Sequence, residues 1–194
     1  NIIAALIFIY GGEKGERCAL KYVGLGGAII LFAGLFDMLD GRLARVSNTT
    51  SKFGAFFDSV LDRYSELFMF LGICYYLIAQ NYLLSSLFAF IAMIGSIMVS
   101  YIRARAEGLG VSCGVGFMQR PERIVIIGLS AICSYAFDLL MGPGYIYHFT
   151  CCPILVFESI SLFTIPLAFV AIFANITAIN RILHTQNALA KPEK

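Results

Sequence analysis

The sequence lacks several features of soluble and nucleic-acid-binding domains. Only 13% of its 194 residues are charged, against about 25% in soluble globular domains. Its net charge of +2 is too small to indicate a nucleic-acid partner, and we expect none. Tryptophan is absent, so any aromatic belt at a membrane surface must come from ten tyrosines and seventeen phenylalanines. The six cysteines show no CxxC or zinc-site spacing, which argues against structural zinc. The sequence does not reveal the state of the adjacent Cys151 and Cys152.

The remaining composition is that of an integral membrane protein. Hydrophobic residues make up 59% of the chain, and its mean hydropathy is +0.83. Apolar segments alternate with short breaks rich in Gly, Ser, Thr, Asn or Pro, which mark turns. The apolar segments are residues 1–10, 20–46, 52–80, 82–106, 121–141 and 154–183. We therefore expect an all-α integral membrane protein with six transmembrane helices. Residues 1–194 should form a single domain, because no internal repeat or separate polar region divides them.

The first apolar segment is too short to cross a membrane. A hydrocarbon core of about 30 Å requires about 20 helical residues, more than residues 1–10 provide. The segment also lacks the basic region and the cleavage site of a signal peptide. We expect a first helix that has lost its N-terminal half, through truncation or disorder. The sequence does not reveal what precedes Asn1.

Basic residues are distributed unevenly between the two sides expected for six helices. Both termini should share one side with the breaks near 47–51 and 107–120. That side collects eleven basic residues: Arg42, Arg45, Lys52, Arg63, Arg103, Arg105, Arg120, Arg123, Arg181, Lys191 and Lys194. The other side has three: Lys14, Arg17 and Lys21. Because basic residues concentrate on the cytoplasmic side, we expect the termini and the aspartates described next to face the cytoplasm, in the cell (inner) membrane.

Four aspartates stand in this apolar setting. Asp37 and Asp40 are spaced i, i+3, and Asp58 and Asp62 are spaced i, i+4, so each pair shares one helix face. Carboxylates in a membrane are costly and usually functional. Four that converge predict a site for divalent hard cations, which prefer oxygen ligands. The alternative is that these acids only form ion pairs with the nearby basic residues, which are Arg42, Arg45 and Arg63.

The aspartates belong to a longer pattern, D-x-x-D-G-x-x-A-R, eight residues, then G-x-x-x-D-x-x-x-D, whose fixed positions all match. This run resembles the signature of the CDP-alcohol phosphotransferase (phosphatidyltransferase) family. The resemblance implies that Asp37, Asp40 and Asp58 hold metal ions, two Mg²⁺ or in some assays Mn²⁺. Asp62 would complete the cluster and act as the general base. The donor-binding residues would be Asp37, Asp40, Gly41, Ala44, Arg45 and Gly54. Gly41 and Gly54 suit this role because their backbone lets a nucleotide approach closely.

A second polar region lies in the segments 100–110 and 119–123. Ser100 and Arg103 share a helix face, and so do Arg120 and Arg123. Arginines beside an acidic metal site predict a pocket for a second anion, although they could instead anchor helices at the membrane surface. The pattern S-Y-x-R-A-R-A-E followed by Q-R-x-x-R resembles the branch that makes phosphatidylinositol phosphate or archaetidylinositol phosphate. The resemblance implies that these four residues bind the acceptor's phosphate, although Arg103 and Gln119 stand where Lys and Glu are common.

We therefore expect a transferase that moves a phosphatidyl-type group from a CDP-lipid to inositol phosphate and releases CMP. The resemblance also implies a homodimer. Glycerol-3-phosphate and free inositol are alternative acceptors, and the donor could carry diacylglycerol, archaeol or a ceramide-like lipid. A cation transporter using the same acids is the alternative from another class. Transporters often have repeated halves and a site near the membrane midplane, whereas this chain has no repeat and its acids lie near one face.

Three weaker patterns complete the sequence predictions. Arg181 and His184, one turn apart in the last apolar segment, either anchor that helix or approach the site, and we favour anchoring. Glu66 lies one turn beyond Asp62 and either pairs with Arg63 or Arg103 or forms a helix–helix contact. A group of glycines is expected to allow close helix packing: Gly24, Gly26, Gly27 and Gly34.

Overall fold

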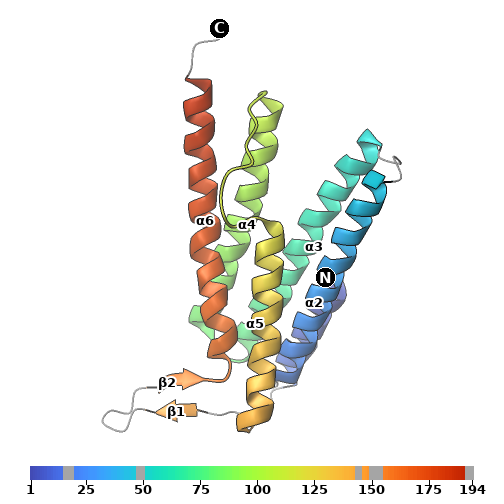
Figure 1. Cartoon of the computed structure of the whole chain (residues 1–194). Helices are drawn as coiled ribbons and strands as arrows, with labels where there is room; N and C mark the ends of the chain where they lie inside the picture. Colours follow the sequence, from blue (N-terminus) through green and yellow to red (C-terminus); the bar gives the residue numbers. More distant parts are fainter. Residues whose placement is uncertain (15–19, 47–50, 143–145, 149–154, 191–194) are drawn as a thin grey trace.

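The computed structural model describes residues 1–14, 20–46, 51–142, 146–148 and 155–190, without the side chains of residues 41–46, 146–148 and 155–157. The described part contains six helices and one two-stranded hairpin (Figure 1). The elements are α1 (Ile2–Glu13), α2 (Leu20–Val46), α3 (Lys52–Ala79), α4 (Leu83–Gly108), α5 (Arg120–Met141), β1 (Ile146–His148), β2 (Leu155–Glu158) and α6 (Ser161–Leu189). The adjacent Cys151 and Cys152 lie outside the described residues.

The six helices pack in a closed ring. Following the ring, α1 packs on α2, α2 on α5, α5 on α6, α6 on α4, α4 on α3, and α3 on α1. The α3 and α5 helices therefore lie across the ring from each other. Near the start of α6 the centre of the ring is filled by aromatic side chains, with Phe8 stacked 6.2 Å from Phe163 and edge-on at 6.1 Å from Tyr76. The apolar core thus occupies the end near the hairpin.

Small residues bring α2 and α5 into close contact, as the sequence predicted. A Cβ atom on Gly27 would lie 2.6 Å from the Cβ of Ala131, and one on Gly24 would lie 2.5 Å from the Cβ of Tyr135. Further along α2, a Cβ on Gly34 would lie 2.9 Å from Ile124. Such distances leave no room for a larger side chain. These glycines therefore fix the α2–α5 contact that leads toward the aspartates.

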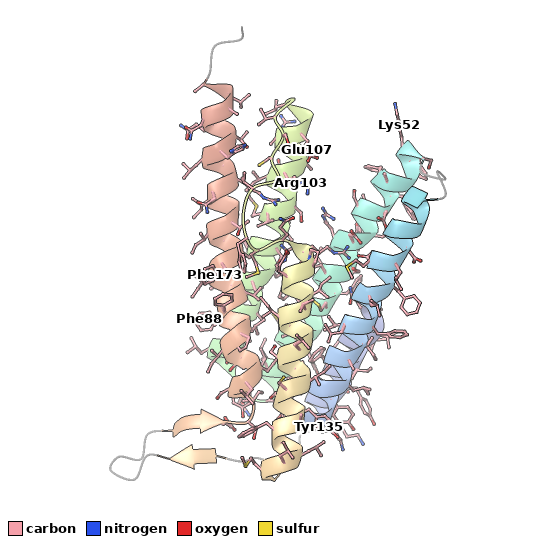
Figure 2. The ribbon with its side chains drawn as sticks, in the orientation of Figure 1. Lys52, Phe88, Arg103, Glu107, Tyr135 and Phe173 are labelled. Carbon is pink, nitrogen blue, oxygen red and sulfur yellow. The ribbon has the colours of Figure 1, made fainter. Side chains whose placement is uncertain are left out.

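Among the described residues, four helices are long and apolar enough to cross a membrane: Leu20–Asp40, Leu83–Gly108, Arg120–Met141 and Ser161–Leu189. The α3 helix is long enough, but its residues 52–66 include the charged Asp58, Asp62, Arg63 and Glu66. The α1 helix is apolar but short. Lys52, at the start of α3, and Arg103 and Glu107, near the end of α4, lie toward the end of the molecule that carries the C-terminus, whereas Tyr135 lies toward the hairpin (Figure 2).

In the last apolar segment, residues 154–183, the predicted secondary structure is wrong. We expected a helix from residue 154, but α6 begins at Ser161, because Leu155–Glu158 forms an antiparallel hairpin with Ile146–His148. The Ser161 hydroxyl accepts a hydrogen bond from the Glu158 amide at 3.2 Å. In addition, the Tyr82 hydroxyl donates to the Glu158 carboxylate at 2.6 Å, which ties the hairpin to the start of α4. The α6 helix also extends beyond its predicted end, to Leu189.

Candidate active site

Three carboxylates converge on the inner face of α2 and α3. Oxygen atoms of Asp37, Asp58 and Asp62 all lie within 4.8 Å of one another. The i, i+4 spacing places Asp58 and Asp62 on one face of α3, and α3 begins with a side-chain cap in which Ser51 accepts from the Gly54 amide at 2.9 Å. Hard divalent cations bind carboxylate oxygens at about 2.0–2.6 Å, so this donor set fits such an ion. Asp40 is exposed one turn further along α2 and is not in this group of described residues.

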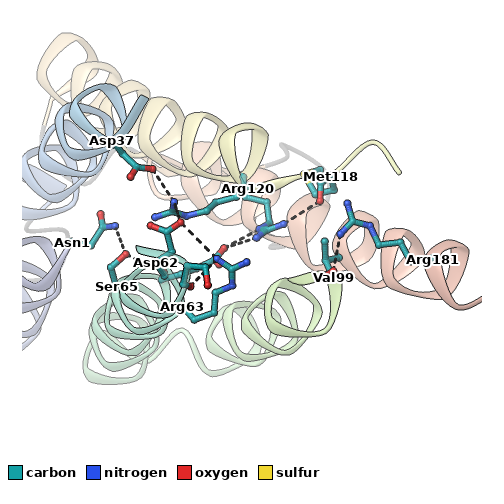
Figure 3. Close-up of polar contacts among 12 residues, drawn as sticks. Asn1, Asp37, Asp62, Arg63, Ser65, Val99, Met118, Arg120 and Arg181 are labelled. Atoms are coloured by element: carbon teal, nitrogen blue, oxygen red, sulfur yellow. Dashed lines mark hydrogen bonds and ion pairs between the residues drawn. The ribbon is translucent and has the colours of Figure 1, made fainter. Parts of the chain in front are cut away.

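Arg120, the first residue of α5, reaches into this carboxylate group (Figure 3). One terminal nitrogen, Nη1, lies 2.8 Å from Asp37 and 2.5 Å from Asp62. Arg63 lies beside the group, 3.6 Å from Asp62. The positive charges offset the repulsion among the three carboxylates. The structure therefore brings Arg120 to the aspartates, and the anion pocket expected beside them stays a prediction.

One turn deeper, a second ion pair joins α3 and α5. Arg123 has no exposed surface. Its Nε donates to Glu66 at 2.9 Å, and its Nη1 donates to the Met118 carbonyl at 3.1 Å. The predicted alternative of a helix–helix contact for Glu66 is thus correct, whereas the predicted partners Arg63 and Arg103 are not the residues that pair with it. The sequence indicated this contact only indirectly. Glu66 lies one turn after Asp62 on α3, and Arg123 lies one turn after Arg120 on α5, so a contact between Asp62 and Arg120 favours one between Glu66 and Arg123.

The connection between α4 and α5 is held in place by α6. Arg181 is buried, and it donates to the carbonyls of Val99 at 2.7 Å and Val115 at 2.8 Å. The Met118 amide donates to the Thr177 hydroxyl at 3.2 Å. His184 contacts the Ser112 carbonyl at 3.3 Å. These contacts agree with the anchoring role favoured for Arg181 and His184, and they fix the segment that leads into Arg120.

The other predicted site residues do not contact the carboxylate group in the described structure. Ser100 is half-buried on α4, and Arg103 is exposed and bonded to Glu107 at 2.8 Å. The two arginines on α5 that were predicted to bind the acceptor differ in exposure, because Arg120 is accessible and Arg123 is not. Gly54 lies in the first turn of α3. Gly41, Ala44 and Arg45, predicted to bind the donor, lie in the part of α2 whose side chains are not described.

Two cavities of different character meet at Asp37 and Arg120. The first, about 270 Å³, contains the carboxylate group and is lined by Asn1, Ala33, Gly34, Asp37, Asp58, Leu61, Asp62, Ser65, Arg120 and Ile124. The second, about 230 Å³, lies between α2 and α5 and is almost entirely apolar; it is lined by Leu31, Gly34, Leu35, Asp37, Met38, Arg120, Pro121, Ile124 and Val125. We call these the polar cavity and the apolar cavity. A ligand with a charged head and an apolar tail matches this pair.

Known proteins resemble the chain in sequence and in fold. It is 39% identical over 110 residues to the archaetidylinositol phosphate synthase of Methanothermobacter thermautotrophicus, covering 57% of this chain and 54% of that protein. The chain thus spans about half the length of the curated relatives it matches. Its fold matches the crystal structure of Mycobacterium tuberculosis phosphatidylinositol phosphate synthase with CDP-DAG bound, with a TM-score of 0.70 and 24% identity over 100% of this chain and 90% of the other.

A second crystal structure of the mycobacterial enzyme, in complex with manganese and citrate, matches with a TM-score of 0.67 and 23% identity, over 100% of this chain and 86% of the other. Residues 2–157 match the sequence profile described as CDP-alcohol phosphatidyltransferase. This stretch contains all four aspartates and three of the four long apolar helices, which indicate an integral membrane protein. The chain belongs to the CDP-alcohol phosphatidyltransferase family.

Proposed function

We propose that this protein transfers a phosphatidyl-type group from a CDP-lipid to inositol phosphate and releases CMP. The observation that carries the proposal is the carboxylate group in the polar cavity, of which Asp37 also lines the adjoining apolar cavity. A CDP-lipid needs both surroundings, because its pyrophosphate is charged and its tails are apolar. The names of the relatives, archaetidylinositol phosphate synthase and phosphatidylinositol phosphate synthase, support inositol phosphate as the acceptor.

In this proposal the carboxylates divide the chemistry between them. Asp37, Asp40 and Asp58 bind divalent metal, two Mg²⁺ or Mn²⁺ ions, which when bound would neutralise the pyrophosphate. Asp62 takes the proton from the acceptor hydroxyl. The hydroxyl oxygen then bonds to the phosphorus that carries the lipid, while the bond from that phosphorus to the bridging oxygen breaks. The bridging oxygen leaves with CMP. The described carboxylate group supports metal binding by Asp37 and Asp58 and places Asp62 beside them, whereas Asp40 lies outside this group.

Binding of the two substrates is assigned to different residues. We assign the donor nucleotide to the end of α2 and the first turn of α3, through Gly41, Ala44, Arg45 and Gly54. The acceptor phosphate is assigned to Arg120, with Ser100, Arg103 and Arg123 completing the pocket. The accessibility of Arg120 supports its assignment to the acceptor phosphate. Arg123 would have to leave Glu66 to contact a ligand directly. Lipid tails would enter through the apolar cavity between α2 and α5.

The proposed arrangement in the membrane has α2 to α6 crossing the bilayer beside the shorter α1, and the active site facing the cytoplasm in the inner membrane. Several observations support it. The ends of α3 and α4 that carry Lys52 and Arg103 lie toward the end of the molecule that bears the C-terminus (Figure 2). Basic residues favour the cytoplasmic side. A homodimer, implied by the family resemblance, forms part of the proposal.

A competition experiment tests the acceptor. The full chain in detergent micelles is given CDP-diacylglycerol or CDP-archaeol, with Mg²⁺ and equal concentrations of inositol phosphate, glycerol-3-phosphate and free inositol. Mass spectrometry of the lipid products identifies the acceptor that was used. We expect the inositol phosphate product to dominate with at least one donor. A dominant product from glycerol-3-phosphate or free inositol would contradict the acceptor assignment while leaving the reaction class intact.

A further inference from the structure

One nitrogen of Arg120 lies between two carboxylates. Its Nη1 is 2.8 Å from Oδ2 of Asp37 and 2.5 Å from Oδ2 of Asp62. Both carboxylates belong to the group that fits a divalent cation. A cation shared by these carboxylates would draw on the negative charge that now holds Arg120, and it would repel the guanidinium charge. Arg120 and the metal therefore compete for the same two carboxylates.

We propose that Arg120 is the counter-ion of the metal-free site, and that metal binding releases its guanidinium to grip a phosphate of the bound substrate. This inference rests on the metal site in the proposed function, and it adds that metal binding and phosphate binding are coupled through Arg120. Without metal, Arg120 neutralises part of the carboxylate charge. With metal, its charge is freed beside the cavities in which the phosphates would lie. Because coupling between two binding events is reciprocal, the phosphate ligand should favour metal binding by holding Arg120 away.

The surroundings of Arg120 allow such a change of partner. Its side chain is 19% exposed and lines both the polar and the apolar cavity. Its Nε is buried and has no hydrogen-bond acceptor among the described residues, so the present position leaves one donor unused. A planar guanidinium with five donors is well suited to a phosphate.

The neighbouring Arg123–Glu66 pair holds the backbone in place, so only the side chain of Arg120 needs to move. Arg123, one turn further along α5, is fully buried and bonded to Glu66 and the Met118 carbonyl. The Met118 amide is itself bonded to Thr177 on α6. These contacts hold the backbone at the start of α5. Arg123 therefore provides a fixed link between α3 and α5, and Arg120 provides an exchangeable one.

The test compares the metal affinity of two variants that each remove one positive charge. Mn²⁺ binding to the substrate-free full chain in detergent is measured by titration for the unaltered protein, Arg120→Gln and Arg63→Gln. Arg63 is the matched control, because it lies beside the same carboxylate but 3.6 Å away and 38% exposed. If Arg120 competes with the metal, Arg120→Gln should bind Mn²⁺ about tenfold or more tightly than Arg63→Gln, as expected for the loss of a competing charge-assisted hydrogen bond.

Arg120→Lys serves as a second variant and keeps the test decisive if Arg120→Gln does not fold. Lysine retains the charge but lacks the guanidinium fork, so it should hold the two carboxylates less tightly, and Arg120→Lys should bind Mn²⁺ more tightly than the unaltered protein. A folded Arg120→Gln that binds Mn²⁺ no more tightly than Arg63→Gln, or a folded Arg120→Lys that binds it no more tightly than the unaltered protein, would overturn the competition while leaving the metal site in place. Failure of the folded, unaltered chain to bind Mn²⁺ at all would instead overturn the metal site, and this inference with it.

Discussion

At the scale of single residues, the three carboxylates of the site repel one another. Asp37, Asp58 and Asp62 hold their oxygens within 4.8 Å of one another, and negative charges so close repel one another. Arg120 and Arg63 relieve part of this repulsion in the described structure. A divalent cation would relieve more of it. The repulsion among these carboxylates thus favours cation binding at this site even without substrate.

Asp62 provides the sharpest test of catalysis at this scale. If it accepts the acceptor's proton, Asp62→Asn should lower kcat by about 10²–10⁴-fold, the usual contribution of general-base catalysis. The KM for the CDP-lipid should change much less, because the other carboxylates remain. Steady-state kinetics with saturating metal would separate the two constants. Near-normal kcat with a raised KM for the donor would move Asp62 from catalysis to binding.

Part of this site follows from local spacing and part does not. The i, i+4 spacing predicts that Asp58 and Asp62 share a face, and the family pattern adds Asp37. The partners of Arg120 and Arg123 depend on how α5 crosses the ring toward α3, which spacing along one helix cannot specify. Glu66 was therefore identified as a polar residue near the site, but its partner Arg123 became clear only from the structure.

At the scale of helices, α3 and α5 are linked across the ring by ion pairs. Arg123 and Glu66 are both buried, with a nitrogen–oxygen distance of 2.9 Å. Removing one partner of a buried pair leaves an uncompensated charge, which typically costs about 3–5 kcal/mol, whereas replacing both with apolar residues often costs little. We therefore expect Arg123→Leu to lower the thermal stability in detergent strongly, and Glu66→Leu with Arg123→Leu to recover much of it.

The double variant has a second use, because it separates stability from substrate binding. A recovered fold with an acceptor KM close to that of the unaltered protein would make Arg123 a structural residue. A recovered fold with a strongly raised acceptor KM would support its predicted contact with the acceptor phosphate. Equal stability of the single and double variants would contradict the buried-pair argument.

The α2–α5 contact makes a second prediction at the scale of helices. Gly27→Ala would place a Cβ atom 2.6 Å from Ala131 and 2.8 Å from the Gly128 carbonyl, so the helices must move apart at a cost of about 1–3 kcal/mol. Gly108→Ala is the matched control, because a Cβ there meets nothing within 4 Å, and alanine is favoured over glycine in a helix by about 0.5–1 kcal/mol. Thermal unfolding in detergent should show opposite shifts, and a shift of the same sign for both would contradict the packing argument.

Helix positions were largely predictable because long apolar runs and polar breaks are local features. The first five predicted segments agree with α1 to α5 within three residues at each end. The hairpin was missed, because the apolar run that includes Leu155–Glu158 reads equally well as the start of the following helix. Its pairing with Ile146–His148 is a contact between segments, and periodicity within one segment does not report it.

At the scale of the whole molecule, the ring has an apolar end and a polar end. Aromatic side chains fill the centre near the start of α6, whereas ion pairs connect α3 and α5 nearer the opposite end. The apolar cavity opens beside the carboxylates, so a lipid could keep its tails among the helices while its charged head reaches the polar cavity. This arrangement accounts for a lipid-modifying enzyme better than for a transporter, which would use a site near the membrane midplane.

The most direct test of the proposed function is CMP release. The full chain is incubated with a CDP-lipid and Mg²⁺, with and without inositol phosphate, and free CMP and the lipid product are both quantified. The account predicts one CMP for each lipid inositol phosphate formed, dependence on both substrates and on divalent metal, and loss of both products in Asp58→Asn. CMP release that does not require an acceptor, or a folded chain that releases none with any CDP-lipid and acceptor tested, would contradict it.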